Sequence, residues 1–218
     1  MTYEILSSGS EGNAVIIDGC ILIDCGVPFS QIRPFYKDLK LVLLTHIHED
    51  HFNRSTVRRL FELRPSLRFG CCDWMVSSLF YALVDKWHID VFNLEGSYTY
   101  QLNGKAVTVS PVALTHNVPQ CGYKIHFLQE NEFLFYATDT SSLDGIEAKY
   151  YDLYMIECNH HEDEIQERIA EKTAAGEFAY EVRASQTHLS WEKAMAWLEE
   201  NAGPDSRFIP MHQHKDKE

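Results

Sequence analysis

Residues 45–51 read Thr-His-Ile-His-Glu-Asp-His and directly follow the apolar run Leu41–Leu44. A short apolar run of this kind is typical of a buried strand. A tight turn after the strand could aim two histidines at one metal ion and the remaining ligands at a second. Imidazole and carboxylate suit Zn²⁺, Mn²⁺ or iron, and without thiolate ligands a closed structural zinc is not expected. The pattern therefore predicts a metal centre, with a histidine-rich surface loop as the alternative. The potential ligands are His46, His48, Asp50 and His51.

Other polar side chains follow strand-like runs in the same way. Loops at the carboxyl ends of strands are positioned by a rigid scaffold, and ligands gather there in layered α/β folds. Six polar residues each follow a strand-like run directly, and this shared position predicts a single site. They are Asp24, His46, His116, Asp139, Asn159 and His212.

Hydrophobic periodicity and turn residues predict the elements that carry these groups. We expect strands at 3–6, 14–18, 21–24, 41–44, 98–102, 105–109, 112–115, 123–128, 133–137, 151–157 and 207–210. Helices are expected at about 54–63, 74–84, 162–173 and 190–200, with a break near Gly176. Asn103-Gly104 is the dipeptide that best supplies the two positive φ angles of a type I′ hairpin turn.

Size and composition predict one globular domain over residues 1–218, with 45% apolar and 12% aromatic residues. No apolar run approaches the length of a membrane span. The N-terminus lacks the basic start and apolar stretch of a signal peptide, so we expect a soluble cytoplasmic protein. The six cysteines show no CxxC pair, and several lie in apolar runs. They are expected to be reduced core residues rather than disulfides or metal ligands.

The net charge of −13 bears on the class of partner. A protein that grips long nucleic acid usually carries a basic surface, because phosphate neutralisation supplies most of its affinity. The acidic balance therefore favours a small substrate over duplex DNA. One basic cluster follows the histidine segment, and it is either a solvated helix face or a phosphate-attracting patch beside the site. Its members are Arg54, Arg58, Arg59, Arg64 and Arg68.

Five segments, in order and over nearly the whole chain, resemble the motifs of the metallo-β-lactamase-fold hydrolase superfamily. The HxHxDH signature of that superfamily is matched in full by residues 46–51. Its early Asp, later His, bridging Asp and final His are matched by Asp24, His116, Asp139 and His212. The resemblance implies a four-layered αβ/βα sandwich, in which two mixed β-sheets pack face to face, helices flank them and the site lies at one edge.

Within the superfamily the chain is similar to the YycJ/WalJ-like and ribonuclease Z/PhnP-like phosphodiesterase branches. Residues 6–13 resemble the Ser-Gly-Ser-x-Gly-Asn opening of YycJ-like proteins, and residues 157–160 resemble their Glu-x-Asn-His segment. Residues 187–190 resemble their Gly-His-Leu-Ser, with Thr187 in place of the usual Gly. Residues 212–214 read His-Gln-His, so His212 and His214 are both candidates for the last ligand. His212 is favoured because it follows the strand directly.

The resemblance also implies ligand roles. One metal would be held by His46, His48 and His116, and the other by Asp50, His51 and His212. Asp139 would bridge the two ions. Asp24 has no ligand role in the family pattern, and it would instead accept a hydrogen bond from a ligand histidine.

Further roles concern the reaction. The equivalent of His188 in ribonuclease Z relatives serves as an acid, so His188 is the candidate general acid, with a capping or packing role as the alternative. Asn159 and His160 would bind substrate or orient their neighbours. Two ions that share a water lower its pKa toward about 7, which makes hydroxide available at neutral pH. The implied catalytic set is Asp50, Asp139 and His188.

These features predict a hydrolase with two divalent ions, Zn²⁺ or Mn²⁺. In it a metal-bridging hydroxide would attack a phosphodiester, and the substrate would be a cyclic nucleotide or nucleic acid. A nuclease acting on DNA or RNA ends is one alternative. The others are a hydrolase of carboxyl esters, thioesters or lactams, and a non-catalytic metal-binding module. Dimers are common among the relatives, so a homodimer is a further expectation, whereas a membrane partner is not.

Overall fold

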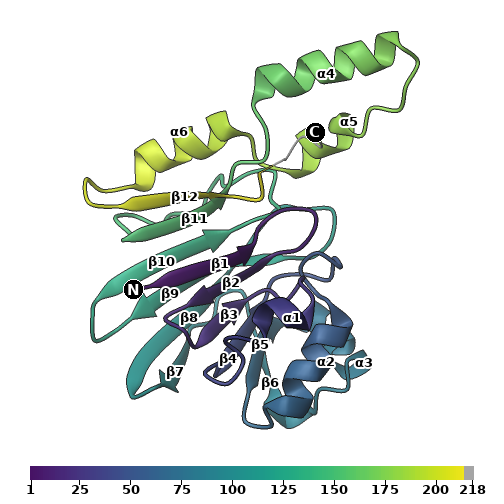
Figure 1. The fold of residues 1–218 in the computed structure, drawn as a ribbon. Helices are drawn as coiled ribbons and strands as arrows, with labels where there is room; N and C mark the ends of the chain where they lie inside the picture. The colour runs from purple at the N-terminus through teal and green to yellow at the C-terminus, as the bar shows by residue number, and fades with distance from the viewer. Residues whose placement is uncertain (214–218) are drawn as a thin grey trace.

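The computed structural model describes residues 1–213, and its centre is a pair of six-stranded sheets (Figure 1). The first sheet has the order β1-β2-β3-β4-β5-β6, and the second has the order β12-β11-β10-β9-β8-β7. The strands of the first sheet are β1 (Tyr3–Ser7), β2 (Ala14–Ile17), β3 (Ile21–Ile23), β4 (Leu41–Leu44), β5 (Arg68–Cys72) and β6 (Ile89–Phe92). Those of the second are β7 (Tyr98–Leu102), β8 (Lys105–Ala113), β9 (Cys121–Phe127), β10 (Glu132–Ala137), β11 (Leu153–Glu157) and β12 (Arg207–Met211).

Helices cover the outer faces of both sheets. In the first half of the chain these are α1 (Phe29–Ile32), α2 (Arg54–Leu63) and α3 (Val76–Tyr81), with 3₁₀ turns η1 (Asp73–Met75) and η2 (Lys86–His88). In the second half α6 (Trp191–Asn201) packs on the outer face of the second sheet, whereas α4 (Glu162–Ala174) and α5 (Glu181–Thr187) pack on each other. Figure 1 shows α4 running out beyond the edge of the sheets, with α5 beneath it. None of the helices in residues 1–213 has the length and apolar character needed to cross a bilayer.

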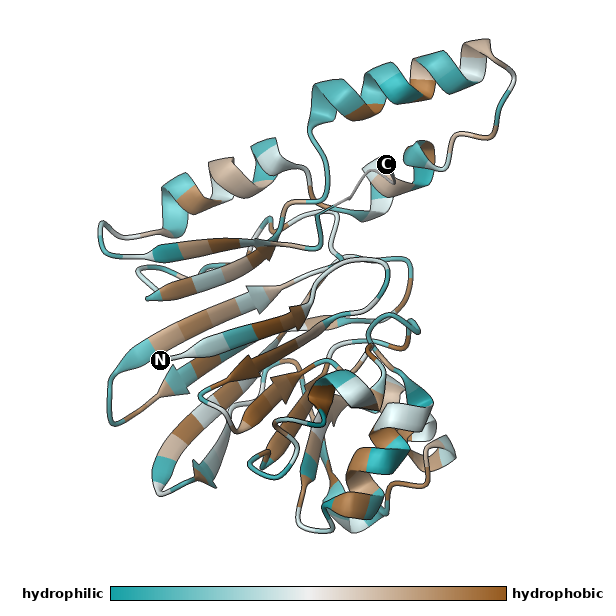
Figure 2. Ribbon diagram, in the orientation of Figure 1, coloured by the Kyte–Doolittle hydropathy of each residue, from teal (hydrophilic) through white to brown (hydrophobic). Residues whose placement is uncertain are grey.

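Strand alternation explains the layers, because successive side chains of a strand point to opposite faces. In β4, Leu41 and Leu43 belong to the core between the two sheets, whereas Val42 and Leu44 pack with α2 and α3. In β11, Met155 belongs to the same central core, whereas the alternate residues pack against α6. Figure 2 shows this pattern as apolar strands at the centre and a largely hydrophilic α4 outside. The four-layered sandwich with two mixed sheets is thereby confirmed.

The direction of the strands decides where polar groups can meet. In the first sheet, β3 and β4 are parallel neighbours. In the second sheet, β10, β11 and β12 are parallel, and β8 runs the same way because β9 is antiparallel to both β8 and β10. The loops that follow these strands therefore leave each sheet at one edge.

Most expected elements are present near their expected bounds. Asn103 and Gly104 have φ angles of 52° and 81°, which is the backbone that the predicted hairpin turn requires. Asn53 and Ser190 cap α2 and α6 by accepting hydrogen bonds from backbone N–H groups. All six cysteines are buried, in line with their setting in apolar runs.

Four elements were not expected. The short parallel strands β5 and β6 each follow a helix or 3₁₀ turn and pair non-locally, so little in the local sequence marks them. The helices α1 and α5 have four and seven residues, too few to show a clear periodicity. The helix expected at 74–84 is shorter, because a 3₁₀ turn precedes α3.

Candidate metal centre

The loops after six strands bring the expected polar groups to one edge of the sandwich. Asp24 follows β3, His46 follows β4, His116 follows β8 and Asp139 follows β10, while Asn159 and His212 follow β11 and β12. Three of these residues have φ angles in the left-handed region, namely Asp24 at 58°, Asp139 at 55° and His212 at 50°. Such backbone is uncommon outside glycine, and it concentrates at functional sites where the surroundings impose it.

One group of potential ligands consists of His46, His48 and His116. His46 Nε2 lies 3.0 Å from His48 Nδ1, and His116 Nε2 lies 3.4 Å from the same atom. Burial lowers the pKa of all three rings, so they are neutral imidazoles at neutral pH. The neutral ring is the form that coordinates a metal, and the three nitrogens are close enough to share one ion.

A second group consists of Asp50, His51, Asp139 and His212. His51 Nε2 lies 2.6 Å from Asp139 Oδ2. His212 Nε2 lies 3.7 Å from Asp50 Oδ2 and 3.6 Å from Asp139 Oδ1. Asp139 thus faces the Nε2 atoms of His51 and His212, and its charge also acts on His46 of the first group. This position between the groups is the one a bridging carboxylate needs.

The charge balance of the second group favours a cation. Burial acts to lower the pKa of His212, but the carboxylates of Asp139 and Asp50 outweigh it and raise that pKa to about 10. Burial likewise acts to raise the pKa of Asp139, but His51 and His212 hold it well below its ordinary value. A divalent ion bound here would therefore displace protons from the histidines.

Four histidines have Nδ1 beside a hydrogen-bond acceptor, which leaves Nε2 directed at the shared space. Such contacts fix the ring orientation and the tautomer of a metal-binding histidine. The Nδ1 contacts are His46 with Thr45 Oγ1 (3.0 Å), His51 with Asp24 Oδ2 (2.6 Å), His116 with the Thr187 carbonyl (3.2 Å) and His212 with Glu157 Oε1 (3.0 Å).

Asp24 and Glu157 are the buried carboxylates behind these rings. Asp24 is inaccessible to solvent and also accepts hydrogen bonds from the backbone N–H and hydroxyl of Thr45. Glu157 is equally buried, and its Oε2 accepts from the backbone N–H groups of Thr140 and Leu189. Its Oε1 lies 2.6 Å from His188 Nδ1 as well as beside His212. Glu157 therefore connects the candidate acid to a candidate ligand.

A third set of possible ligands overlaps the second and contains Asp139, Glu157, His188 and His212. Both oxygens of Glu157 already accept hydrogen bonds from backbone or from Nδ1 atoms. Its geometry is that of a group that orients histidines, so we assign it that role rather than coordination.

Three loops pack tightly beneath the metal groups. The Cys25 N–H donates to the His51 carbonyl (2.9 Å), and the Asn53 N–H donates back to the Cys25 carbonyl (2.7 Å). Asn13 is fully buried, and its backbone N–H donates to the Asp50 carbonyl (2.6 Å). The approach is so close that a Cβ on Gly26 would lie 1.8 Å from the Asp50 carbonyl oxygen. Asn13, in the segment of residues 6–13, thus packs directly against the loop that carries Asp50 and His51.

A cavity of about 320 Å³ lies over the two groups, and His48, Asp50, His116, Asp139, His188 and His212 all reach its surface. Within the described part of the chain, Arg183 on α5 is the only Lys or Arg that lines it. The basic cluster of α2 and β5 does not. Arg58 and Arg59 on α2 face Glu62, which matches a solvated helix face, whereas Arg68 lies on β5 and pairs with Asp90.

The residues present fit a divalent metal. His212 Nε2 is buried without a hydrogen-bond partner, and Asp139 Oδ2, which lies 2.6 Å from His51 Nε2, makes no hydrogen bond of acceptable geometry. An unsatisfied buried polar atom is costly, and a metal bound by His212 and Asp139 would satisfy both side chains. The donor set of imidazole and carboxylate, open to a cavity, is that of a reactive site rather than a closed structural one.

All sequence-predicted ligands between His46 and His212 lie at this site, and Asn159 and His160 lie at its border. His214 lies outside the described residues. The sequence interpretation gave no role to Thr45, Glu157, Tyr180 or Arg183. Glu157 had two usable signals, because it is the single charged residue of the otherwise apolar β11 and it begins the Glu-x-Asn-His segment of residues 157–160.

We predict that Gly26→Ala displaces the loop at Asp50, because the added methyl group overlaps a backbone oxygen. The expected cost is about 3 kcal/mol of unfolding free energy, at the upper end for overpacking. Metal affinity should fall with it. Denaturant unfolding and metal titration measure the two effects.

Gly203→Ala is the matched control, because its nearest contact is a side-chain atom of Tyr150 at 3.1 Å. It should change stability by less than about 1 kcal/mol. Equal stability and metal affinity in the two variants would contradict the proposed packing of the loops.

Comparisons with known proteins agree with this architecture. A family model described as a β-lactamase superfamily domain matches residues 20–213. A search of curated proteins finds no significant match. Among solved structures, the metallo-β-lactamase fold protein YhfI from Bacillus subtilis has a TM-score of 0.72 at 18% identity and covers 97% of this chain and 85% of its own.

Two further structures are similar over nearly the full chain. Human tRNase Z, short form (ELAC1), has a TM-score of 0.68 at 13% identity, covering 99% of this chain and 93% of its own. Unliganded yeast PDE1 has a TM-score of 0.65 at 11% identity, covering 99% and 88%. At these identities the likeness concerns the fold. Because the family model spans most of the sequence, the chain belongs to the β-lactamase superfamily domain family and has the metallo-β-lactamase fold.

Proposed function

We propose that this protein is a phosphodiesterase that uses two divalent ions, Zn²⁺ or Mn²⁺, to cleave a nucleotide-type substrate. The observation that carries the proposal is the contact between His188 Nδ1 and the buried carboxylate of Glu157, at 2.6 Å, on the wall of the metal cavity. A phosphodiester needs its leaving oxygen protonated, and a histidine held at Nδ1 can present the opposite ring nitrogen for that task. Relatives named as a tRNase Z and PDE1 support the same class.

Each residue has a distinct part in this proposal. His46, His48 and His116 hold one ion, Asp50, His51 and His212 hold the other, and Asp139 faces both. When bound, the ions supply an activated water and neutralise charge on the phosphoryl group. Arg183 adds positive charge above the cavity, close enough to act electrostatically on His48.

His188 is placed to reach a leaving group. Its ring stacks on His212 at a centroid distance of 5.1 Å and lies 5.6 Å from His116. Its side chain is 19% exposed, so one part of the ring faces the cavity while Glu157 holds the other. Asn159 is a candidate substrate or positioning residue, since its Nδ2 donates to the His212 carbonyl at 2.9 Å.

We predict that His188→Ala slows cleavage of a dinucleotide by about 10²–10⁴-fold, the usual contribution of a general acid. Bis(p-nitrophenyl) phosphate should be affected much less, because p-nitrophenolate leaves without a proton. His48→Ala should abolish both activities. Initial rates of metal-loaded protein, with metal content measured alongside, give the comparison.

His126→Ala is the control, because that ring stacks on Phe133 away from the site and should leave both rates unchanged. No turnover of either ester at full metal loading would contradict the proposal. Turnover of carboxyl esters, thioesters or lactams that needs His48 but not His188 would assign the chain to that class instead.

We further predict that Glu157→Gln lowers kcat for the dinucleotide about tenfold or more, because the amide cannot stabilise a charged His188. The same change in a His188→Ala background should cost little, since residues that act as a unit are not additive. Asp152→Asn, at the opposite end of β11, should leave kcat unchanged. Additive losses in the double variant, or a loss fully explained by missing metal, would contradict this role. Glu157 would then orient only the candidate ligand His212.

A further inference from the structure

A second cavity, which we call the side cavity, lies between α4, α5 and the loop that follows β11. Its volume is about 270 Å³. Its wall includes two aromatic rings, two amides and two imidazoles, together with charged and apolar side chains. The residues that matter for its chemistry are Asn159, His160, Arg168, Tyr180, Trp191 and Gln213.

The side cavity adjoins the metal cavity. Tyr180 and Ala184 line both. Asn159 lines the side cavity while its Nδ2 donates to the carbonyl of His212, a candidate ligand. A group attached to a phosphate at the metal centre could therefore pass over the small side chain of Ala184 and enter the side cavity.

One face of α5 links the two cavities. Tyr180, Arg183, Ala184 and Thr187 recur at the spacing that places side chains on one side of a helix, and all four line the metal cavity. Arg183 brings the positive charge that suits a phosphate, and Tyr180 brings a ring at the mouth of the side cavity. The helix thus presents a charged contact and an aromatic contact about one turn apart.

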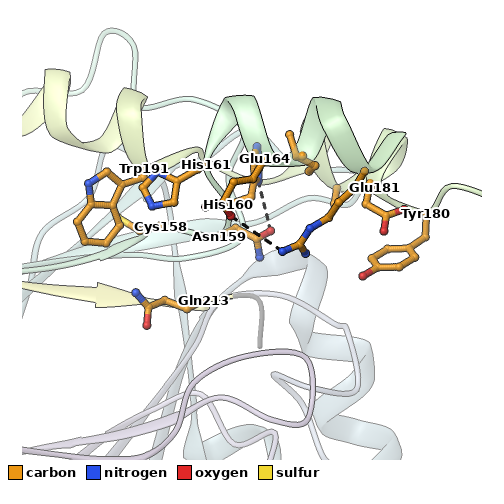
Figure 3. A pocket seen from close by; sticks show the side chains of 12 residues that line it. Cys158, Asn159, His160, His161, Glu164, Tyr180, Glu181, Trp191 and Gln213 are labelled. Carbon is orange, nitrogen blue, oxygen red and sulfur yellow. Dashed lines mark hydrogen bonds and ion pairs between the residues drawn. The ribbon is translucent and has the colours of Figure 1, made fainter. Parts of the chain in front are cut away.

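The wall suits a planar, polar ring. Figure 3 shows Trp191 at one end of the side cavity and Tyr180 at the other, with Asn159 and His160 between them. Aromatic rings bind the faces of unpaired bases, and amide or imidazole groups can bind their edges. The acidic residues of the wall are neutralised, because Glu181 pairs with Lys172 and Glu164 lies 3.9 Å from Arg168.

The aromatic groups are held in place before any ligand enters. The Trp191 backbone N–H donates to the His160 carbonyl at 2.9 Å, and its ring packs on Phe208 and His161. The Lys172 ammonium lies 4.4 Å from the centre of the Tyr180 ring. Preorganised side chains lose little entropy on binding, which favours recognition over incidental contact.

We propose that the side cavity is a nucleoside subsite, which takes the unpaired nucleoside attached to the scissile phosphate. This inference rests on the proposed phosphodiesterase function and narrows its substrate. A base must be free of its partner to enter the side cavity and lie against Tyr180 or Trp191, so a mononucleotide diester or a single-stranded end fits and the interior of a duplex does not. The small volume and the acidic surface agree with that choice.

The test compares two esters that release the same p-nitrophenolate: thymidine 5′-p-nitrophenyl phosphate and methyl p-nitrophenyl phosphate. Wild-type protein should prefer the thymidine ester in kcat/KM. Tyr180→Ala should reduce that preference about tenfold, as expected for the loss of one base–aromatic contact, and Tyr180→Phe should keep it. Phe178→Ala removes an 88% exposed ring from the same loop and should behave like wild type on both esters.

A binding readout separates the subsite from catalysis. Thymidine 5′-monophosphate should quench tryptophan fluorescence in a saturable way, and Trp191→Phe should remove that quench. An unchanged preference in Tyr180→Ala, or a quench that persists in Trp191→Phe, would overturn the subsite while leaving the phosphodiesterase proposal in place. Turnover of neither ester would overturn the phosphodiesterase proposal instead, and the quench would then decide the subsite by itself.

Discussion

Everything at the candidate centre depends on two sheets whose strands end at one shared edge. Leu41 and Leu43 of the first sheet share one buried core with Tyr123 and Ile125 of the second, and this core holds the sheets face to face. Because β4 ends at that edge in one sheet and β8, β10 and β12 end there in the other, groups more than a hundred residues apart reach a common space. The ligands therefore need no long excursions of the chain, and the rigid core sets their positions.

This arrangement buries many polar and charged groups close together. Charges removed from water are stable only when they are paired and hydrogen-bonded. The fold meets that requirement with Asp24 and Glu157, each of which accepts hydrogen bonds from backbone N–H groups and faces a histidine Nδ1. The same contacts turn the free ring nitrogens toward the metal space, so stability and orientation arise from one set of interactions.

Much of the fold, and the gathering of the candidate ligands at one edge of it, could be predicted from the sequence. Residues 45–51 directly follow a buried strand, and the same rule located His116, Asp139 and His212. The orienting role of Glu157 was missed because it depends on tertiary contacts. Its carboxylate accepts hydrogen bonds from the loops at Thr140 and Leu189, which the local sequence does not indicate.

Other features depend on tertiary contacts that no local pattern reports. The parallel strand β5 is defined by its pairing with β4, and β6 by its pairing with β5. The short helix α5 contributes to the site because its residues line the metal cavity. The roles of the site residues, the single domain, the cytoplasmic location and the homodimer stay predictions.

The central claim is a two-ion centre assembled from strand ends, and anomalous X-ray diffraction from metal-loaded crystals tests it most directly. The account predicts two peaks, one among His46, His48 and His116 and one among Asp50, His51 and His212, with Asp139 between them. A single peak coordinated by Glu157 and His188, or no peak at these residues in crystals soaked with excess metal, would contradict it.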